Sequence, residues 1–202
     1  SQCRQECRPR RLFDFKLIDP AMGCGYFLLE AAEFLAREFA AFLTRIGTPM
    51  PLPKIRRRVL ERCIYGIELD PLSAELAALI LSAGSPSPSL LRNLRCGDAL
   101  LGATFTQLKN AAGGHGFDAV IGNPPYSGHR SNVNARELKK RFEVCAECPN
   151  LAAAFIEQSV NYLAPGGRFG LIVPKSIQYV ESWQSVRALV ARKTPHEQLV
   201  DV

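Results

Sequence analysis

Short apolar segments of strand length alternate along this chain with longer segments whose apolar residues recur at helical spacing. This alternation is typical of a parallel sheet whose strands are joined by helices lying on both of its faces. We therefore predict an α/β fold with a doubly wound, mostly parallel sheet. The expected strands are Phe13–Ile18, Ile64–Leu69, Leu91–Cys96, Phe117–Gly122, Arg168–Val173 and the beginning of a sixth at Gln198–Val202.

Helices are expected between these strands, where apolar residues recur along one helical face. The segments with this pattern are Tyr26–Thr44, Lys54–Arg62, a helix that begins at Asp70-Pro71, Leu151–Leu163 and Ser182–Arg192. The third of these has an apolar face made of Leu72, Leu76, Leu79 and Ile80. Glycine, proline and serine favour loops at Gly84–Ser89 and Gly113–Gly116, and a turn at Pro165–Gly167.

A chain of 202 residues, of which 47% are hydrophobic, is long enough for one well-buried domain and short for two. We expect a single domain that spans residues 1–202. No apolar segment approaches the length of about eighteen residues that a membrane-spanning helix requires, and the basic, polar beginning of the chain lacks the apolar core of a signal peptide. A cytoplasmic protein with no membrane contact is therefore expected.

The seven cysteines are an odd number at irregular spacing, which argues against a disulfide scaffold. The alternative, a zinc site, would draw on the close pairs Cys3/Cys7 and Cys145/Cys148. These pairs are far apart in sequence. We favour free thiols in a reducing compartment and expect no bound metal.

Basic side chains are concentrated in patches, and the formal net charge of the chain is +6. The patches consist of Arg4, Arg8, Arg10 and Arg11; of Arg56, Arg57 and Arg58; and of Arg130, Arg136, Lys139, Lys140 and Arg141. Such patches suit a polyanion partner, because neutralised phosphates release counterions. A solvated helix face is the alternative interpretation of the same pattern.

Candidate site residues are sought at the carboxyl ends of the predicted strands, where doubly wound sheets bind ligands. The first strand leads into the turn Asp19-Pro-Ala-Met-Gly-Cys-Gly25. Its glycines let the backbone approach a ligand closely, and the helix that follows offers unpaired amides. A nicotinamide cofactor is disfavoured, because Leu28 stands where the dinucleotide fingerprint requires a third glycine.

Carboxylates close the second and third strands. Glu68 ends the second strand, where it could accept hydrogen bonds from two ribose hydroxyls of a nucleoside. Asp70 is a weaker candidate for the same ligand, because it can serve simply as the cap of the helix that begins at Pro71. Asp98 follows the third strand, where it could accept a bond from the amino group of an adenine ring; a solvated loop aspartate is the alternative.

The most specific pattern is Asn123-Pro124-Pro125-Tyr126, which closes the apolar fourth strand. The two prolines stiffen the turn and cannot donate, so the carbonyl groups beside them are free to accept from a ligand. A side-chain oxygen and a proline carbonyl that converge on one point suit an amino group, which has two donors. The ring of Tyr126 offers a stacking surface for a flat base. A simple Pro-Pro turn with a surface tyrosine is the alternative.

Taken in order, these segments resemble the motif series of the amino-methyltransferases. The likeness rests on Asp19-Pro-Ala-x-Gly-x-Gly-x-Phe27, Gly66-Ile-Glu-Leu-Asp-Pro71, Gly97-Asp98, Asn123-Pro-Pro-Tyr126, Phe155-Ile-Glu157 and the segment from Leu163 to Ser176. The chain most resembles the adenine-specific DNA methyltransferases of restriction-modification and phage-defence systems. Where that family usually has Cys and Ser, this chain has Met22 and Cys24, which keeps the glycines of the turn. The resemblance implies a Rossmann-like, S-adenosylmethionine-dependent methyltransferase core.

The resemblance also implies roles for individual residues. The cofactor-binding residues would be Asp19, Ala21, Gly23 and Gly25 for the methionine part of S-adenosylmethionine, Glu68 for its ribose, Asp98 for its adenine amino group, and also Asp70. Asn123 and the carbonyl of Pro124 would grip the amino group of a target adenine that is flipped out of the duplex and stacked on Tyr126. These two acceptors localise the lone pair of the amine, so direct transfer needs no enzyme nucleophile.

The expected partner is double-stranded DNA with a flipped adenine. The residues expected to contact it are Pro125, Arg130, Lys139, Lys140 and Arg141, most of them in the polar segment Ser127–Asn150, which we expect to form a loop beside the flipped base. Residues 1–202 leave no room for a target-recognition domain, so a separate recognition region or subunit is expected as a second partner. Two alternatives stay open: an amino-methyltransferase that acts on protein glutamine or RNA, and a non-catalytic cofactor-binding fragment.

Overall fold

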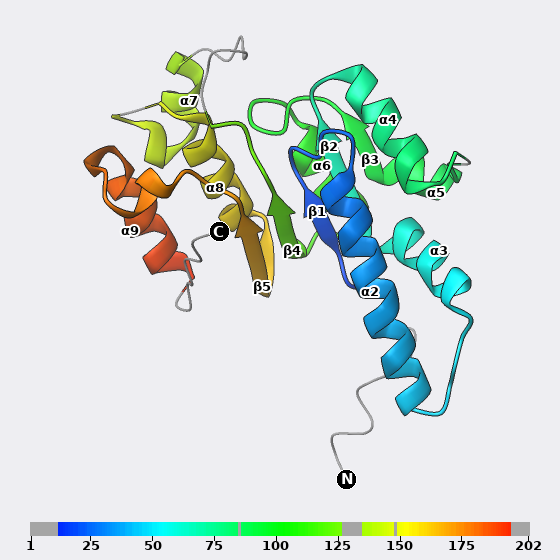
Figure 1. Cartoon of the computed structure of the whole chain (residues 1–202). Helices are drawn as coiled ribbons and strands as arrows, with labels where there is room; N and C mark the ends of the chain where they lie inside the picture. The colour runs from blue at the N-terminus through cyan, green and yellow to red at the C-terminus, as the bar shows by residue number, and fades with distance from the viewer. Residues whose placement is uncertain (1–11, 85, 127–134, 148, 195–202) are drawn as a thin grey trace.

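The computed structural model describes residues 12–84, 86–126, 135–147 and 149–194. They contain a five-stranded, all-parallel sheet in the order β3-β2-β1-β4-β5 (Figure 1). The strands are β1 Leu17–Asp19, β2 Ile64–Glu68, β3 Leu94–Cys96, β4 Phe117–Gly122 and β5 Leu163–Leu171. The strand order reverses between β1 and β4, which is the point at which doubly wound sheets bind ligands. The predicted fold class is confirmed.

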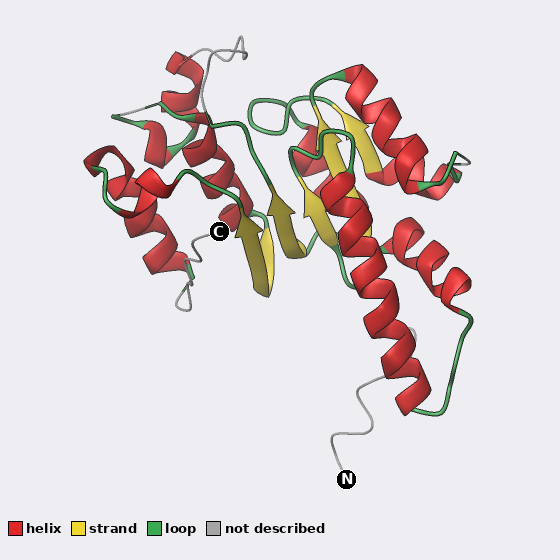
Figure 2. Ribbon diagram, in the orientation of Figure 1, coloured by secondary structure: helices red, strands yellow, loops and turns green. Residues whose placement is uncertain are grey.

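Helices cover both faces of the sheet, as Figure 2 shows. The face of Leu17 and Ile64 packs against α2 Tyr26–Arg45, α3 Leu52–Arg62, α4 Pro71–Leu81 and α5 Pro88–Asn93. The face of Ile18 and Tyr65 packs against α6 Thr104–Ala111, α7 Ala135–Arg141, α8 Leu151–Asn161, α9 Gln184–Lys193 and the short 3₁₀ helices η3 Glu143–Cys145, η4 Lys175–Gln178 and η5 Glu181–Trp183. Successive strand residues point to opposite faces, so each apolar strand contributes to two hydrophobic cores.

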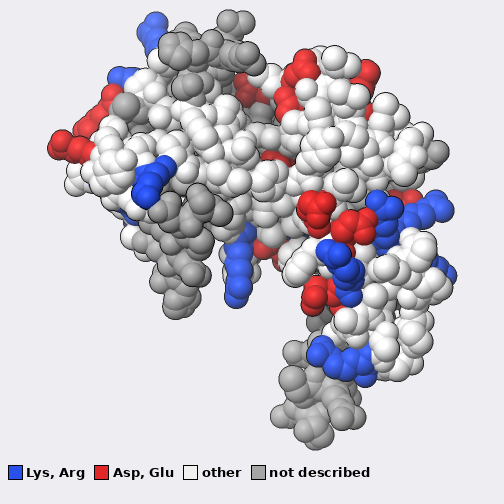
Figure 3. All heavy atoms as spheres, viewed as in Figure 1, with Lys and Arg blue, Asp and Glu red and all other residues white. Residues whose placement is uncertain are grey.

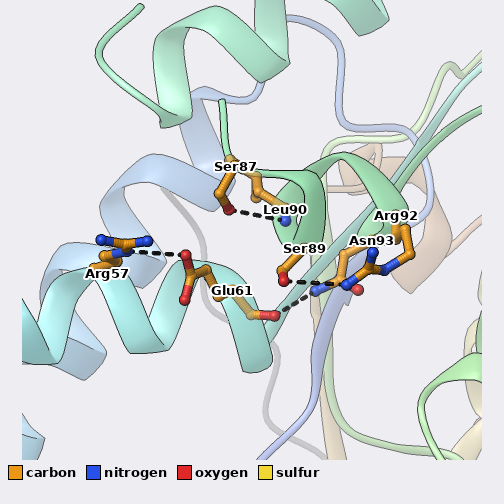
Figure 4. Close-up of polar contacts among 7 residues, drawn as sticks. All are labelled: Arg57, Glu61, Ser87, Ser89, Leu90, Arg92 and Asn93. Carbon is orange, nitrogen blue, oxygen red and sulfur yellow. Dashed lines mark hydrogen bonds and ion pairs between the residues drawn. The ribbon is translucent and has the colours of Figure 1, made fainter. Parts of the chain in front are cut away.

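Strands β1 and β3 begin later in the chain than predicted, and β2 ends one residue earlier. Phe13 lies in a turn before β1, and its buried ring packs edge-to-face on Phe39 of α2. The segment before β3 is helical from Pro88 onward, so the predicted loop and strand there are partly wrong. The Ser87 side chain caps this helix by accepting from the N–H of Leu90 (3.3 Å), and the Asn93 amide donates to the carbonyl of Glu61 (3.1 Å) in α3 (Figure 4).

The predicted apolar face of α4 is wrong in its orientation. Leu72, Leu76 and Leu79 are exposed, at 65%, 39% and 48%, whereas Ala77, Ala78 and Leu81 are buried. The reason is the tight contact between α4 and the beginning of α2. A Cβ placed on Gly25 would lie 3.1 Å from the Cβ of Ala77, so only a small side chain fits between the two helices there.

The second half of the sheet also departs from the predictions. Helix α6 forms in a segment for which no element was predicted, and helix α7 forms within the polar segment that was expected to be a loop. Both bury apolar residues, Phe105 and Leu108 in α6 and Leu138 in α7. Strand β5 begins at Leu163, which pairs with Phe117, and the register then shifts so that Ala119 pairs with Arg168. The predicted turn at Pro165–Gly167 coincides with this shift. The predicted sixth strand lies outside the described residues, and the single-domain expectation stays a prediction.

Within the described residues, no helix combines the length and apolar character needed to cross a membrane. In the same part of the chain, no group of three or more His, Cys, Asp or Glu side chains is arranged to hold a metal ion. Cys24, Cys63 and Cys96 are free thiols. Burial raises the pKa of Cys63 to about 12, so this thiol is protonated at neutral pH.

Candidate active site

The turn that follows β1, residues 19–25 (the β1 turn), is organised around a buried carboxylate. Asp19 is 1% exposed, and its Oδ1 accepts a hydrogen bond from the backbone N–H of Ala21 (2.9 Å). Burial raises the pKa of Asp19 to about 7; the Ala21 amide opposes this shift and the carboxylate of Glu68 adds to it. Asp19 therefore holds its proton more readily than an exposed aspartate does.

Two glycines give the β1 turn its shape, since Gly23 and Gly25 have φ values of 53° and 83°. Gly25 allows the contact with α4 described above. A Cβ on Gly23 would meet no described atom within 4 Å, so there is open space beside this part of the backbone. Open space at the entrance to α2 suits a ligand that accepts from backbone amides.

Glu68 connects the β1 turn to the end of β2. Its Oε2 accepts from the N–H of Gly23 (2.8 Å), and its Oε1 accepts from the N–H of Asp70 (2.9 Å). The N–H of Met22 also donates a hydrogen bond to the carbonyl of Ile67 (3.0 Å). Each carboxylate oxygen of Glu68 retains a second lone pair, so the side chain is oriented by the backbone and can still accept from hydroxyl groups.

Asp70 caps helix α4. Its Oδ2 accepts from the backbone N–H of Ser73 (2.8 Å) and from the Ser73 hydroxyl (2.7 Å). These hydrogen bonds to Ser73 lower the pKa of Asp70, which is exposed. Its interpretation as a helix cap is confirmed, whereas its contact with a cofactor stays a prediction.

Asp98 lies in the turn that follows β3, residues 97–102 (the β3 turn). Its Oδ1 accepts from the backbone N–H groups of Leu100 (2.7 Å) and Leu101 (2.8 Å). The N–H of Gly97 donates to the carbonyl of Glu68 (2.8 Å), which joins this turn to β2. Both side-chain bonds engage Oδ1 alone, so Asp98 is oriented while Oδ2 can accept from another group.

The turn that follows β4, residues 123–126 (the β4 turn), begins beside Asp19. A Cβ on Gly122 would lie 2.7 Å from Oδ1 of Asp19, so the end of β4 and the buried carboxylate are in direct contact. Asn123 is exposed, and Tyr126 is 39% exposed. The Tyr126 hydroxyl donates to Oδ1 of Asn123 (2.7 Å). The amide oxygen of Asn123 is thus held at an exposed position adjacent to the β1 turn.

The structure therefore gathers the predicted cofactor and catalytic residues at one end of the sheet. Glu68 contacts the β1 turn directly, and the β4 turn begins one residue after Gly122, which contacts Asp19. The β3 turn joins them through its bond to Glu68. The individual roles of these residues stay predictions.

The basic residues predicted to contact DNA differ in their surroundings. Arg130 lies outside the described residues. In α7, Lys139 is exposed and Lys140 pairs with Glu137 (3.1 Å). Arg141, in contrast, donates from Nη1 to the carbonyl of Leu101 (2.8 Å), which belongs to the β3 turn.

The basic patch of α3 is largely engaged with its own surroundings. Arg56 pairs with Glu33 of α2, and Arg57 pairs with Glu61 (3.0 Å). The guanidinium of Arg58 lies 5.5 Å from the centre of the Phe13 ring. Figure 3 shows basic and acidic atoms next to each other in this region of α2 and α3. These contacts within the protein explain the arginines of α3 without a bound polyanion.

Two buried polar residues of α8 were not predicted from the sequence, and one of them, Gln158, contacts the candidate site. Gln158 is 4% exposed, and its side-chain amide donates to the carbonyl of Ala99 (3.0 Å) in the β3 turn. Glu157 is 7% exposed and accepts from the N–H of Val144 (2.9 Å). The signal that could have found them is the presence of adjacent polar residues within an otherwise apolar helix, because buried polar groups require partners.

Comparison with known proteins decides the family. The sequence profile of the Eco57I restriction-modification methylase family matches residues 62–202, which is more than half of the chain and includes Glu68, Asp98 and the β4 turn. The chain belongs to this family. The predicted resemblance to restriction-modification methyltransferases is thereby confirmed.

Relatives of this family member include two type II proteins. The methyltransferase M.XhoI from Xanthomonas vasicola is 29% identical over 96% of this chain and 34% of its own length. The restriction enzyme and methyltransferase RM.Eco57I from Escherichia coli is 24% identical over 89% of this chain and 22% of its own length. A tRNA1(Val) (adenine(37)-N6)-methyltransferase from Porphyromonas gingivalis is 27% identical over 64% of this chain and 47% of its own length. The chain thus spans about a third or less of the two type II relatives.

Solved structures support the same fold. A DrdV–DNA complex superposes with a TM-score of 0.65 at 19% identity, covering 89% of this chain and 19% of DrdV. A protein from Listeria monocytogenes assigned to the class I S-adenosylmethionine-dependent methyltransferases superposes with a TM-score of 0.51 at 20% identity, covering 88% of this chain and 45% of that protein. The restriction-modification methylase chain therefore has the fold of this methyltransferase class.

The polar groups of the site fit S-adenosylmethionine. The carboxylates of Asp19 and Glu68 suit a ligand with positively charged groups and ribose hydroxyls, and Oδ2 of Asp98 suits an aromatic amino group. The open space beside Gly23 gives such a ligand access to backbone amides. The site therefore has the acceptors that this cofactor requires, at the reversal point of the strand order.

Proposed function

We propose that this family member is the catalytic core of an S-adenosylmethionine-dependent methyltransferase that modifies the exocyclic N6 amino group of adenine in DNA. The observation that carries the proposal is the contact of Gly122 with Asp19, because the acceptor Asn123 follows Gly122 directly. An acceptor for a substrate amine therefore lies next to the turn proposed to hold the cofactor. Membership in a restriction-modification methylase family supports DNA as the substrate.

The proposed mechanism relies on two acceptors in the β4 turn. An aromatic amine is a weak nucleophile, because its lone pair is delocalised into the ring. Oδ1 of Asn123 and the carbonyl of Pro124 would each accept one N–H of the target amine and so localise the lone pair on nitrogen. S-adenosylmethionine, when bound, supplies a methyl group on a sulfonium centre. The chain contributes positioning and electrostatic preorganisation and needs no nucleophile of its own.

Tyr126 has two functions in this proposal. Its hydroxyl orients the side chain of Asn123, and its partly exposed ring would stack on the flipped adenine. The amine would then take over the position of the tyrosine hydroxyl, or share Oδ1 with it, since an amide oxygen has two lone pairs. Pro125 would line the same surface, and Lys139 and Lys140 would contact phosphates near the flipped base.

An adenine amino group in RNA is the second candidate substrate. It is favoured by the similarity of 64% of the chain to a tRNA1(Val) (adenine(37)-N6)-methyltransferase. Adenine presents the same amino group in both nucleic acids, so the β4 turn would act in the same way.

Methyl transfer from radiolabelled S-adenosylmethionine to duplex DNA, to RNA and to a glutamine-containing peptide tests the proposal. We expect label in DNA, recovered as N6-methyladenine after digestion. Label confined to RNA or peptide would contradict the DNA substrate. Cofactor binding by calorimetry without transfer to any substrate would favour a non-catalytic role.

A further inference from the structure

The β3 turn is held by side chains that come from far along the chain. Within the turn, Asp98 accepts from the amides of Leu100 and Leu101. Two further side chains, Arg141 at the end of α7 and Gln158 in α8, donate to backbone carbonyls of the same turn. The turn therefore depends on residues that follow the β4 turn in sequence.

Gln158 fixes the turn from the core. Its side chain is 4% exposed, and its amide donates to the carbonyl of Ala99 at 3.0 Å. A buried amide that lacks a partner is unfavourable, so this bond restricts both α8 and the turn. The contact joins residues that are 59 positions apart in the sequence.

Arg141 fixes the turn from the surface. Its Nη1 donates to the carbonyl of Leu101 at 2.8 Å, and its Nη2 lies 3.5 Å from the carbonyl of Gly102. A planar guanidinium can address two successive carbonyls in this way, whereas an ammonium group acts as a single point charge. A Cβ on Gly102 would lie 2.8 Å from the carbonyl oxygen of Asp98, so the turn has little room to rearrange.

We propose that Arg141 and Gln158 are positioning residues that hold Asp98 in place for the adenine ring of the cofactor. This inference rests on the proposed function, because Asp98 is the proposed cofactor contact. Arg141 then acts on the cofactor side of the site, in contrast to Lys139 on the same helix, whose exposed side chain suits a phosphate. Helices α7 and α8 would couple cofactor binding to the segment that follows the catalytic turn.

Calorimetry of S-adenosylmethionine binding in the absence of DNA tests this role. Arg141→Met and Gln158→Leu should each weaken binding about fivefold to tenfold, which corresponds to about 1–1.4 kcal/mol. Arg141→Lys, which retains one donor for Leu101, should recover part of the loss. Lys139→Met is the matched control on α7 and should bind the cofactor as the wild type does. Thermal unfolding verifies that each variant is folded.

Salt dependence of DNA binding separates this role from a phosphate contact. Loss of a phosphate contact lowers the slope of log K against log salt by about one and leaves cofactor affinity unchanged. We expect this behaviour from Lys139→Met. The same behaviour from Arg141→Met would overturn the inference.

Hydrogen exchange gives a readout that does not require the cofactor. The amides of Leu100 and Leu101 donate to Asp98, so they should exchange faster in Arg141→Met and Gln158→Leu than in Lys139→Met. Unchanged protection of both amides would overturn the inference. A wild-type protein that fails to bind S-adenosylmethionine while the two variants still lose protection would contradict the proposed function and leave the role of the two side chains intact.

Discussion

The β1 turn and the β4 turn lie next to each other, yet they are stabilised in different ways. The β1 turn is bonded to the neighbouring strand by the amides of Met22 and Gly23, and its carboxylate, Asp19, is buried. The β4 turn is largely exposed, and its key side chain, Asn123, is held by one hydrogen bond from Tyr126. The first turn is built as a rigid receptor, whereas the second presents an acceptor whose partner can be exchanged.

This difference fits the two ligands that the site is proposed to bind. A cofactor of constant structure is bound best by groups that are already oriented, since less ordering is then required on binding. A base that leaves a duplex must find an acceptor that is accessible from outside. Substitutions in the two turns should therefore separate cofactor binding from methyl transfer.

The largest effect is expected from Asn123→Ala. Loss of one of two acceptors should lower the methyl-transfer rate by about 10²-fold to 10³-fold, similar to the loss of one preorganised hydrogen-bonding group in other enzymes. Cofactor affinity should be unchanged, because Asn123 belongs to the exposed turn. Radiolabel transfer and calorimetry measure the two quantities, with Asn110→Ala in α6 as the matched control. An equal loss in both quantities would show that the two turns are not separable.

The second effect concerns Asp19 and pH. Because the pKa of Asp19 is raised from 3.8 to about 7, the folded state retains its proton between these values while the unfolded state releases it. The wild type should therefore lose stability as the pH rises from about 4 to about 7, by on the order of 3 kcal/mol. Asp19→Asn cannot titrate, so its unfolding free energy relative to the wild type should increase over this range. Urea unfolding of both proteins at roughly pH 4.5 and pH 8 measures this change in relative stability. If the difference in unfolding free energy between the variant and the wild type were the same at both pH values, the raised pKa of the buried Asp19 would be contradicted.

A smaller effect is expected from Gly122→Ala, which tests the contact between the two turns. The added Cβ would lie 2.7 Å from Oδ1 of Asp19, so either the strand end or the carboxylate must shift. We expect a loss of about 1–3 kcal/mol in the free energy of unfolding, together with weaker cofactor binding and slower transfer. Gly170→Ala in β5 is the control, because a Cβ there meets no described atom within 4 Å. If Gly122→Ala and Gly170→Ala had the same stability and activity, the proposed contact between the β1 turn and the β4 turn would be contradicted.

The smallest effect is expected from Asp70→Asn. Bonds to Ser73 lower the pKa of Asp70, so its stabilising contribution is present above the ordinary pKa of an aspartate and is lost as the pH falls through the lowered value. The unfolding free energy of Asp70→Asn should lack this decrease at low pH. The pH dependence that Asp70 contributes has the opposite sign to that of Asp19, whose contribution decreases as the pH rises. Asparagine is also a good N-cap, so stability at neutral pH should be nearly unchanged. A clear loss of cofactor affinity in this variant would assign Asp70 to the ligand as well as to the helix.

Much of the fold could be predicted because it depends on local patterns. The apolar strands and the long helices α2 and α8 follow directly from hydrophobic periodicity. Helix α5 could not be recognised, because its six residues begin in a proline- and serine-rich segment that resembles a loop. The orientation of α4 also escaped prediction, since it depends on the size match between Ala77 and Gly25, which periodicity does not report.

The candidate site could be predicted in part for a topological reason. Parallel strands place their carboxyl ends at one edge of the sheet, so Asp19, Glu68, Asp98 and Asn123 could be expected to lie near one another. The contacts of Arg141 and Gln158 with the β3 turn could not be derived in this way. They join distant segments and depend on how α7 and α8 pack, and basic residues such as Arg141 suggest phosphate binding when only charge is considered.

The central claim is that the β4 turn presents oxygen acceptors to an amino group beside the β1 turn. A crystal structure with an S-adenosylmethionine analogue and adenine-containing DNA tests it most directly. We predict that Oδ1 of Asn123 and the carbonyl of Pro124 both lie within hydrogen-bonding distance of the target amino group, with the base on the ring of Tyr126. An adenine bound elsewhere, with the Asn123 side chain directed away from its amino group, would contradict the account.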